Sequence, residues 1–261
     1  MNTFHIMRKE LRTYFNSTIA YAFFLIFLFI VGYLFTFTIF QYSDFSQLAI
    51  RNPMMMQKLN PAQSILTPLF QLMGFLLIFL VPVLTMRIFA EEKKLGTIEL
   101  LFTYPVTEMQ LVIGKFLAST AILFIMFLFS FVYIILFNNV FAFKGAEVPW
   151  GIIFSGYLGI FLLSLSFMAF GMWVSSLTSD QVTSALATVG GLLLFWIIGS
   201  AQSQFTNPVL VGIVRQLSLV NHFQDFTKGI INTHHLVYFI CFILFFVFLT
   251  VQVLEVRKWK G

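Results

Sequence analysis

Charged residues are scarce in this sequence, and six long stretches contain none at all. The 261 positions include only 15 Lys or Arg and 10 Asp or Glu. The uncharged stretches lie between Arg12 and Asp44, Lys58 and Arg87, Lys115 and Lys144, Glu147 and Asp180, Asp180 and Arg215, and Lys228 and Glu255. Each can contain the roughly 20 apolar residues with which a helix crosses a hydrocarbon core. A soluble domain of this length needs charge over most of its surface, so the sequence predicts an integral membrane protein.

The apolar segments predict six transmembrane helices. We expect an all-α polytopic fold in which residues 1–261 form a single transmembrane domain embedded in a lipid bilayer. The expected spans are roughly 18–40, 66–88, 110–137, 152–177, 183–201 and 235–254. The first of them is longer than the core of a signal peptide and lacks a small-residue cleavage site, so we expect it to be retained.

Residues able to carry catalysis or bind a metal are also few. Cys241 is the only cysteine, which excludes an intrachain disulfide and argues against a cysteine-based metal site. The four histidines are His5, His222, His234 and His235, and none has a carboxylate or cysteine at metal-ligand spacing. Two of them are adjacent and point to different sides of any helix. We therefore expect interfacial polar histidines and no bound metal.

No sequence motif for nucleotide binding or nucleophilic catalysis is present either. The chain has no Walker A motif, no Rossmann glycine pattern and no nucleophile elbow, so we expect no enzyme activity and no bound cofactor. The spans lack the buried ionisable residues typical of ion-coupled carriers. The net charge of +5 does not indicate nucleic-acid binding, because the basic residues cluster at span ends.

The distribution of basic residues predicts the orientation. An even number of spans places both termini on one side, together with the loop after the second span. Ten Lys or Arg fall on that side, against five on the other. The ten are Arg8, Lys9, Arg12, Arg87, Lys93, Lys94, Lys115, Arg257, Lys258 and Lys260. By the positive-inside rule both termini are cytoplasmic, and we expect a bacterial inner membrane.

Two segments outside the spans have an amphipathic pattern. Residues 3–15 place four apolar side chains at helical spacing, which predicts a helix lying in the cytoplasmic interface. These side chains are Phe4, Met7, Leu11 and Tyr14. Residues 202–234 are too apolar for a simple external loop and predict short helices that dip into the outer leaflet or cap the bundle. Their apolar positions are Ile213, Leu217, Val220, Phe223 and Phe226.

Small residues recur along the fourth and fifth spans. Gly156 and Gly159 lie in one span, and Ser184, Thr188 and Gly191 share one face of the next. Close helix packing is the usual role of such residues in membranes. A lining for a transport pathway is the alternative.

In the second span, Pro82 is expected to bend the helix.

The connection after the second span contains helix breakers on either side of a short amphipathic segment. Gly96 can end one helix, Thr97 can cap the next, and Pro105 can stop it. Thr107 and Gln110 then form a capping box that starts the third span. In the short helix Ile98, Leu101 and Phe102 share one side, while Glu99 faces elsewhere. This pattern predicts a rigid cytoplasmic knob that presents apolar and acidic side chains, with an ordinary helical hairpin as the alternative.

At this connection the sequence resembles the membrane subunits of type-2 (ABC-2) ABC transporters. The matching residues are Glu91-Glu92, Gly96-Thr97-Ile98-Glu99, Leu100-Leu101, Pro105 and Gly114-Lys115. Lys93-Lys94 departs slightly from the family pattern, in which many members have one basic residue. The six spans and the N-terminal interfacial helix extend the resemblance over nearly the whole chain. It implies that residues 96–104 are a coupling helix seated in a groove of an ATPase. The residues expected at this ATPase-coupling interface are Glu91, Glu92, Gly96, Thr97, Ile98, Glu99, Leu101, Phe102 and Pro105.

A second stretch is similar to one branch of that family. Leu217-Ser218, Asn221–Phe226, Lys228–Ile231 and Tyr238-Phe239 resemble the gliding-motility-associated permease and its copper-enzyme-maturation relatives, and we favour the gliding branch. The resemblance implies a half-transporter, expected to export, that pairs with a second permease copy or a related subunit. A separate cytoplasmic ATPase would use ATP and Mg²⁺, and an auxiliary membrane protein would join the complex. The alternative from another class is a non-transporting scaffold that anchors a motility or assembly complex.

Overall fold

The computed structural model describes residues 3–50, 61–97, 106–142, 150–200, 212 and 216–258, and these contain helices and turns but no strand. Their helices are α1 (Thr3–Phe15), α2 (Thr18–Ile50), α4 (Pro61–Thr85), α5 (Ala90–Lys94), α7 (Glu108–Ala142), α8 (Trp150–Leu177), α9 (Gln181–Ser200), α11 (Leu219–Thr227) and α12 (Thr233–Lys258). The expected all-α fold class is confirmed.

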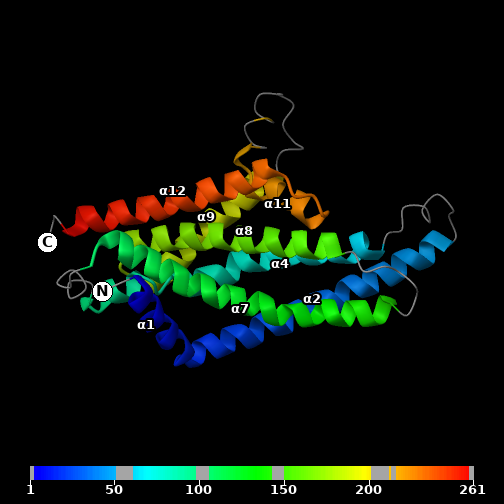
Figure 1. Cartoon of the computed structure of the whole chain (residues 1–261), viewed down its shortest axis with the longest axis horizontal. Helices are drawn as coiled ribbons and strands as arrows, with labels where there is room; N and C mark the ends of the chain where they lie inside the picture. The colour runs from blue at the N-terminus through cyan, green and yellow to red at the C-terminus, as the bar shows by residue number, and fades with distance from the viewer. Residues whose placement is uncertain are drawn as a thin grey trace.

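Six helical segments are long and apolar enough to cross a membrane, as the sequence predicts. They are Ala20–Leu48, Gln63–Lys94, Glu108–Phe137, Trp150–Leu177, Gln181–Gly199 and Thr233–Val256. The long helices run along the longest axis of the molecule, and both termini lie at the same end (Figure 1). That arrangement is the one that an even number of spans requires.

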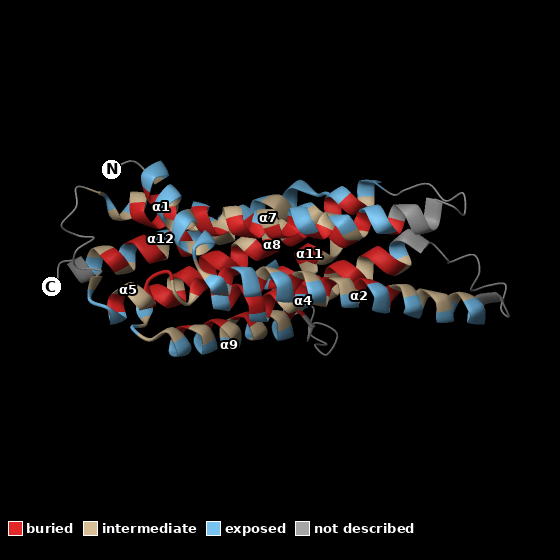
Figure 2. Cartoon of the chain, turned by 90° about the horizontal axis from the view of Figure 1, so that it is seen from below, coloured by how far each residue is buried: buried red, intermediate tan, exposed pale blue. Residues whose placement is uncertain are grey.

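Helix α8 forms the centre of the bundle. It contacts α4, α7, α9, α11 and α12. Buried residues are concentrated along α4 and α8, whereas much of α2 and α9 is exposed (Figure 2). The exposed positions are largely apolar, with Phe29 78% and Leu186 68% exposed. Side chains of this kind on a membrane span face lipid or another subunit rather than water, because exposing a continuous apolar surface to water is unfavourable.

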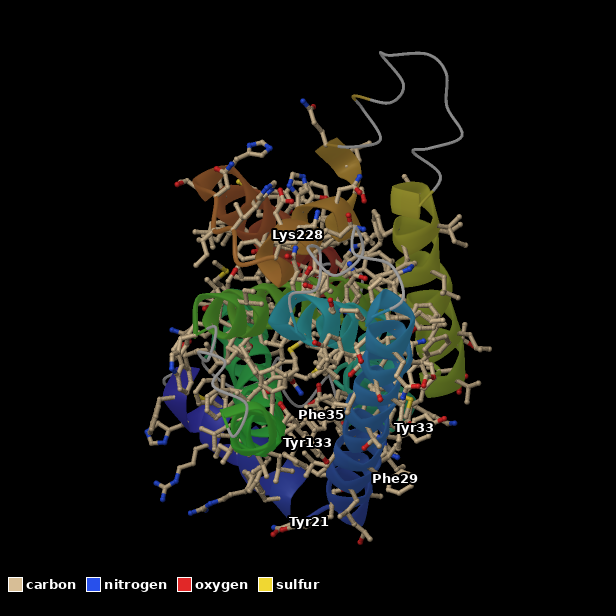
Figure 3. All side chains as sticks on the ribbon, turned by 90° about the vertical axis from the view of Figure 1, so that its right-hand side faces the viewer. Tyr21, Phe29, Tyr33, Phe35, Tyr133 and Lys228 are labelled. Atoms are coloured by element: carbon tan, nitrogen blue, oxygen red, sulfur yellow. The ribbon has the colours of Figure 1, made fainter. Side chains whose placement is uncertain are left out.

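One side of α2 packs against α7 while the other faces outward. The Tyr133 hydroxyl of α7 donates to the carbonyl of Leu28 at 2.7 Å, and its ring contacts Phe35. Gly32 makes this approach possible, because a Cβ there would lie 2.7 Å from the Tyr133 oxygen. In Figure 3, Phe35 and Tyr133 lie between the two helices, whereas Phe29 and Tyr33 lie on the outer side of α2.

The N-terminal helix α1 forms at the expected residues and packs against α7 and α2. Ile6 is its buried residue, and Met7, Leu11 and Tyr14 are half-buried on the same side. Phe4 was expected on this face but is 67% exposed, because Ile6 occupies the inner position against Gly114 of α7. The amphipathic helix is therefore rotated from the expected register.

The second span is interrupted near the end that lies beside α1 and the end of α12 (Figure 2). Pro68 and Pro82 both lie inside α4, which ends at Thr85, one turn after Pro82. Residues 86–89 form a turn before α5 begins, and the chain leaves α5 at Gly96, whose φ is +69°. Glycine adopts this left-handed conformation without the steric strain of other residues. The break expected at Gly96 is confirmed, whereas the bend expected at Pro82, which lies inside α4, stays a prediction.

The third span begins with the expected capping box. The Thr107 N–H donates to Gln110 Oε1 at 3.4 Å, and the Gln110 N–H donates to Thr107 Oγ1 at 3.3 Å. Each side chain thereby satisfies a backbone donor that the first turn of α7 cannot pair internally.

The segment before the last span contains α11, a short helix packed against α8, α9 and α4. Val220, Phe223 and Phe226 are buried on its inner side, as the sequence predicts, whereas Leu217 is exposed and Ile213 lies outside the described residues. The hydroxyls of Ser155 and Thr67 donate to the last carbonyls of α11, those of Phe226 and Thr227, at 2.8 and 2.9 Å. These contacts fix α11 as a cap on the bundle.

Candidate functional site

Residues 86–97, here called the root segment, join the second span to the predicted coupling helix. The N–H groups of Phe89 and Ala90 donate to Ser175 Oγ of α8, at 3.2 and 3.1 Å. Lys93 Nζ donates to the carbonyl of Ser176. Because α5 is only five residues long, it could not hold its own position, and α8 supplies these anchors.

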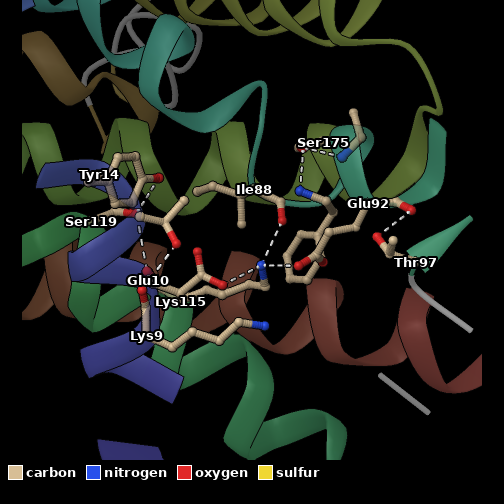
Figure 4. Close-up of polar contacts among 12 residues, drawn as sticks. Lys9, Glu10, Tyr14, Ile88, Glu92, Thr97, Lys115, Ser119 and Ser175 are labelled. Atoms are coloured by element: carbon tan, nitrogen blue, oxygen red, sulfur yellow. Dashed lines mark hydrogen bonds and ion pairs between the residues drawn. The ribbon is translucent and has the colours of Figure 1, made fainter. Parts of the chain in front are cut away.

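Lys115 of α7 fastens the root segment to two further helices. Its ammonium donates to Glu92 Oε1 at 2.7 Å, to Glu10 Oε1 of α1 at 3.0 Å and to the carbonyl of Ile88 at 3.0 Å (Figure 4). Three donors thus meet three acceptors, and the Phe89 ring lies 5.5 Å from the same nitrogen. We call Lys115, Glu10 and Glu92 the Lys115 cluster.

Within the Lys115 cluster the lysine is shielded from solvent, whereas the side chains of Glu10 and Glu92 are 20% and 19% exposed. Lys115 is 3% exposed, and Glu92 Oε2 is buried without a hydrogen-bond partner among the described residues. A cavity of about 440 Å³ lies beside it, bounded by Tyr14 and Arg87 among others. Burial raises the pKa of the Tyr14 phenol, whose hydroxyl lies 3.4 Å from Ser119 Oγ. The charges of the cluster pair with one another, which is the pattern of a structural network.

The residues expected to couple to an ATPase are only partly described. Ile98, Glu99, Leu101, Phe102 and Pro105 lie outside the described residues. Of the others, Glu91, Glu92, Gly96 and Thr97 all belong to the root segment, and the Thr97 hydroxyl donates to the carbonyl of Glu92 at 3.3 Å.

Glu92 differs from what the sequence suggests. It was expected among the acids presented to a partner, but its carboxylate points inward to Lys115. The cause is the lysine of the Gly114-Lys115 pair, which a sequence reading of the loop alone does not connect with Glu92.

The small residues of α8 and α9 lie against large side chains of the same chain. A Cβ on Gly156 would come within 2.2 Å of the Phe70 ring, and one on Gly159 within 2.4 Å of Phe226 Cβ. A Cβ on Gly191 would lie 2.4 Å from Phe170 Cζ. Ser184 and Thr188 are fully buried, with the Thr188 hydroxyl donating to the Ser184 carbonyl at 2.7 Å. These contacts favour close packing over a pathway lining at these positions.

A comparison with known protein families shows to which family this six-span chain belongs. The sequence model described as "ABC-2 family transporter protein" matches residues 4–256. The chain belongs to this ABC-2 family. No protein of curated function matches the sequence.

Family membership makes the chain the membrane component of a transporter. ABC-2 permeases carry no ATPase domain of their own, which agrees with the missing Walker A motif, and the family implies partnership with an ABC ATPase. The root segment, to which the Lys115 cluster is attached, ends directly before the residues in which the sequence predicts a coupling helix.

The structure also assembles a histidine cluster that the sequence analysis missed. His222 of α11 lies beside His235 of α12, with their Nδ1 atoms 2.6 Å apart. His235 Nε2 is 2.9 Å from Asp225 Oδ2, and the Tyr238 ring stacks on His222 at 4.0 Å. Burial lowers the pKa of His222. Sequence spacing alone does not find this cluster, because Asp225 pairs with His235 of the next helix.

Proposed function

We propose that this chain is the permease half of an ATP-driven exporter and that residues 96–104 dock onto a separate cytoplasmic ATPase. The observation that supports the proposal is the attachment of the root segment. Contacts through Ser175, Lys115 and Glu10 tie it to α8, α7 and α1 together. A force applied to the residues after Gly96 would thus reach three helices of the bundle.

The same contacts suggest how ATP turnover would move the permease. ATP binding closes a pair of ATPase subunits, and the docked knobs are displaced with them. Because the root segment is clamped at Ser175 and Lys115, the displacement rotates the inner ends of the helices as a unit instead of bending the connection. A second permease copy or related subunit completes the pathway, and the two halves alternate between inward-facing and outward-facing states.

The gliding-motility branch is the specific assignment that we favour within this function. It is supported by the resemblance of residues 217–239, which include α11 and the start of α12, to that branch. An auxiliary membrane protein would then join the permease and its ATPase. A permease of the copper-enzyme-maturation type is the closest alternative, and a non-transporting scaffold is the alternative from another class.

Substitutions in the predicted coupling helix test the proposal. Phe102→Ala removes an aromatic anchor whose burial contributes about 2 kcal/mol at the centre of an interface, so docking should be lost. Glu99→Arg adds like-charge repulsion, whereas Glu99→Ala removes a rim ion pair worth about 0.2–1 kcal/mol and should act mildly.

Each variant is co-expressed with the partner ATPase, and co-purification and ATP turnover in reconstituted membranes are measured. Ile230→Ala, an exposed position in the α11–α12 connection, is the matched control and should leave both unchanged. If the Phe102→Ala and Glu99→Arg variants both bind the ATPase as well as the wild type does, residues 96–104 do not couple to it. The non-transporting scaffold would then be the favoured function.

A further inference from the structure

Three histidines gather between α11 and the first turn of α12, on a part of the molecule remote from the termini (Figure 1). The metal-ligating nitrogens of His222, His234 and His235 all lie within 4.8 Å of one another. A cavity of about 660 Å³ opens beside them, lined also by Asp225 and Lys228. Lys228 is labelled in Figure 3, where this end of the molecule faces the viewer.

The hydrogen bonds of two of these rings define where their protons lie. His222 Nε2 is 3.1 Å from the carbonyl of Gln216, and a carbonyl oxygen can only accept. His235 Nε2 is 2.9 Å from the carboxylate of Asp225, which also accepts. Each Nε2 therefore carries the hydrogen, and in the neutral ring each Nδ1 carries a lone pair.

These two lone pairs face each other across 2.6 Å. For two neutral rings of this tautomer the contact is repulsive, and either a proton shared by the two nitrogens or a metal ion held by both removes the repulsion. Two imidazoles bound to one tetrahedral metal at 2.0–2.1 Å hold their nitrogens about 3.3 Å apart, so a small outward tilt of the rings would admit an ion. His234, at the exposed rim, can supply a third nitrogen.

The surroundings of the rings are those that metal-binding histidines have. Such a histidine almost always donates its other N–H to a carboxylate or a backbone carbonyl, which fixes its tautomer and orientation. Asp225 does this for His235, and Gln216 does it for His222. Tyr238 holds the His222 ring by stacking and donates its own hydroxyl to the carbonyl of Leu217 at 2.7 Å.

We propose that His222, His234 and His235 bind a divalent first-row transition-metal ion, with Asp225 as the residue that positions His235. Imidazole nitrogens suit Zn²⁺, Cu²⁺, Ni²⁺ and Co²⁺, whereas Mg²⁺ and Ca²⁺ prefer oxygen. Three protein ligands leave a fourth position open toward the cavity for water or a small anion. This site does not depend on the transport function proposed above, because it lies on α11 and α12, away from the root segment.

The test uses the full chain, purified in lipid nanodiscs through a tag without histidine and stripped of metal. Co²⁺ is titrated and its visible absorption recorded, and Zn²⁺ is then used to displace it. One saturating equivalent of Co²⁺, with the intense absorption of a tetrahedral site, is expected. Absence of saturable binding of either ion would overturn the proposal.

Substitutions in the cluster test whether the metal ion binds there. His234→Gln changes an exposed residue, so it leaves the fold intact and should weaken binding at least tenfold. Asp225→Asn should weaken it about 10–100-fold and alter the Co²⁺ spectrum, because it changes the orientation and basicity of His235. His5→Gln on α1 is the matched control and should change neither. Unchanged binding by His234→Gln, or an equal loss in His5→Gln, would show that the ion does not bind at this cluster.

Discussion

Lys115 joins α7 to α1 and to the end of the second span. Its ammonium is buried among two carboxylates and a carbonyl, and those acceptors come from α1 and from the end of the second span. A buried ion pair is weak evidence of net stability, because desolvation offsets much of the attraction. Removing only one member is different, since the remaining charges stay buried without compensation.

We expect Lys115→Met to destabilise the chain by about 3–5 kcal/mol, because Glu10 and Glu92 would then face each other without a cation. The measurement is the free energy of unfolding in a mild detergent. Lys94→Met is the matched control, since Lys94 pairs with Asp180 at 3.5 Å and both side chains are exposed. It should change stability by less than about 1 kcal/mol.

Adding Glu10→Gln and Glu92→Gln to Lys115→Met should recover part of the lost stability, because the uncompensated charges are then removed. A triple variant no more stable than Lys115→Met alone would contradict the electrostatic explanation and attribute the loss to packing.

Two adjacent glycines of α9 provide a second comparison of single residues. A Cβ on Gly191 would lie 2.4 Å from Phe170 Cζ, whereas a Cβ on Gly190 would meet nothing within 4 Å. The Phe170 ring cannot swing away, because Phe195 and Phe246 pack against it. We expect Gly191→Ala to destabilise the chain by about 1–3 kcal/mol. Gly190→Ala should be neutral or stabilise it by up to about 1 kcal/mol.

Thermal unfolding of both alanine variants in the same detergent distinguishes these outcomes. Equal midpoints would mean that the α8–α9 contact opens easily, as the lining of a transport pathway would.

Among the helices, α5 is too short to be stable alone and owes its position to α8. Its first N–H groups are satisfied by Ser175 Oγ, in the role that a helix N-cap side chain normally has. The capping group thus comes from a residue about 85 positions away in sequence. A movement of α8 should therefore move α5 with it.

Ser175→Ala should loosen the root segment, with a loss of about 1–2 kcal/mol. Amide hydrogen exchange should accelerate at Phe89 and Ala90 while the centres of the spans stay protected. Ser166→Ala is the matched control: that hydroxyl is equally buried but donates within its own helix to the carbonyl of Leu162. If amide hydrogen exchange at Phe89 and Ala90 is unchanged in Ser175→Ala, then Lys115 and Lys93 are sufficient to hold α5 in place.

The sequence predicts those elements whose formation depends on residues close to one another in the chain. The six spans follow from apolar length, the start of α7 from Thr107 and Gln110, and the end of α5 from Gly96. The Lys115 cluster could not be predicted, because Glu10 and Lys115 are 105 residues apart and meet only when α1 packs on α7. The histidine cluster was missed for a related reason, since the turn between α11 and α12 decides which rings face each other.

At the scale of the whole molecule, the end that carries the termini differs in its chemistry from the region around the α11–α12 connection. The end with the termini carries α1, the root segment and the Lys115 cluster, and ten of the fifteen basic residues were assigned to it from the sequence. The α11–α12 connection, with the histidine cluster, lies away from the termini. This polarity predicts which end faces the cytoplasm, because basic residues are retained on the side where insertion begins.

We predict that the end with the termini is cytoplasmic, and single cysteines can test this in a Cys241→Ala background. Leu95 after α5 is 68% exposed and Ile230 between α11 and α12 is 53% exposed, so cysteine at either position can be reached by a reagent. In intact spheroplasts a membrane-impermeant maleimide should label Ile230→Cys but not Leu95→Cys, and permeabilisation should make both reactive. Labelling of Leu95→Cys alone in intact spheroplasts would reverse the orientation. A reversed orientation would also remove the coupling proposal, because the residues after Gly96 could then not meet a cytoplasmic ATPase.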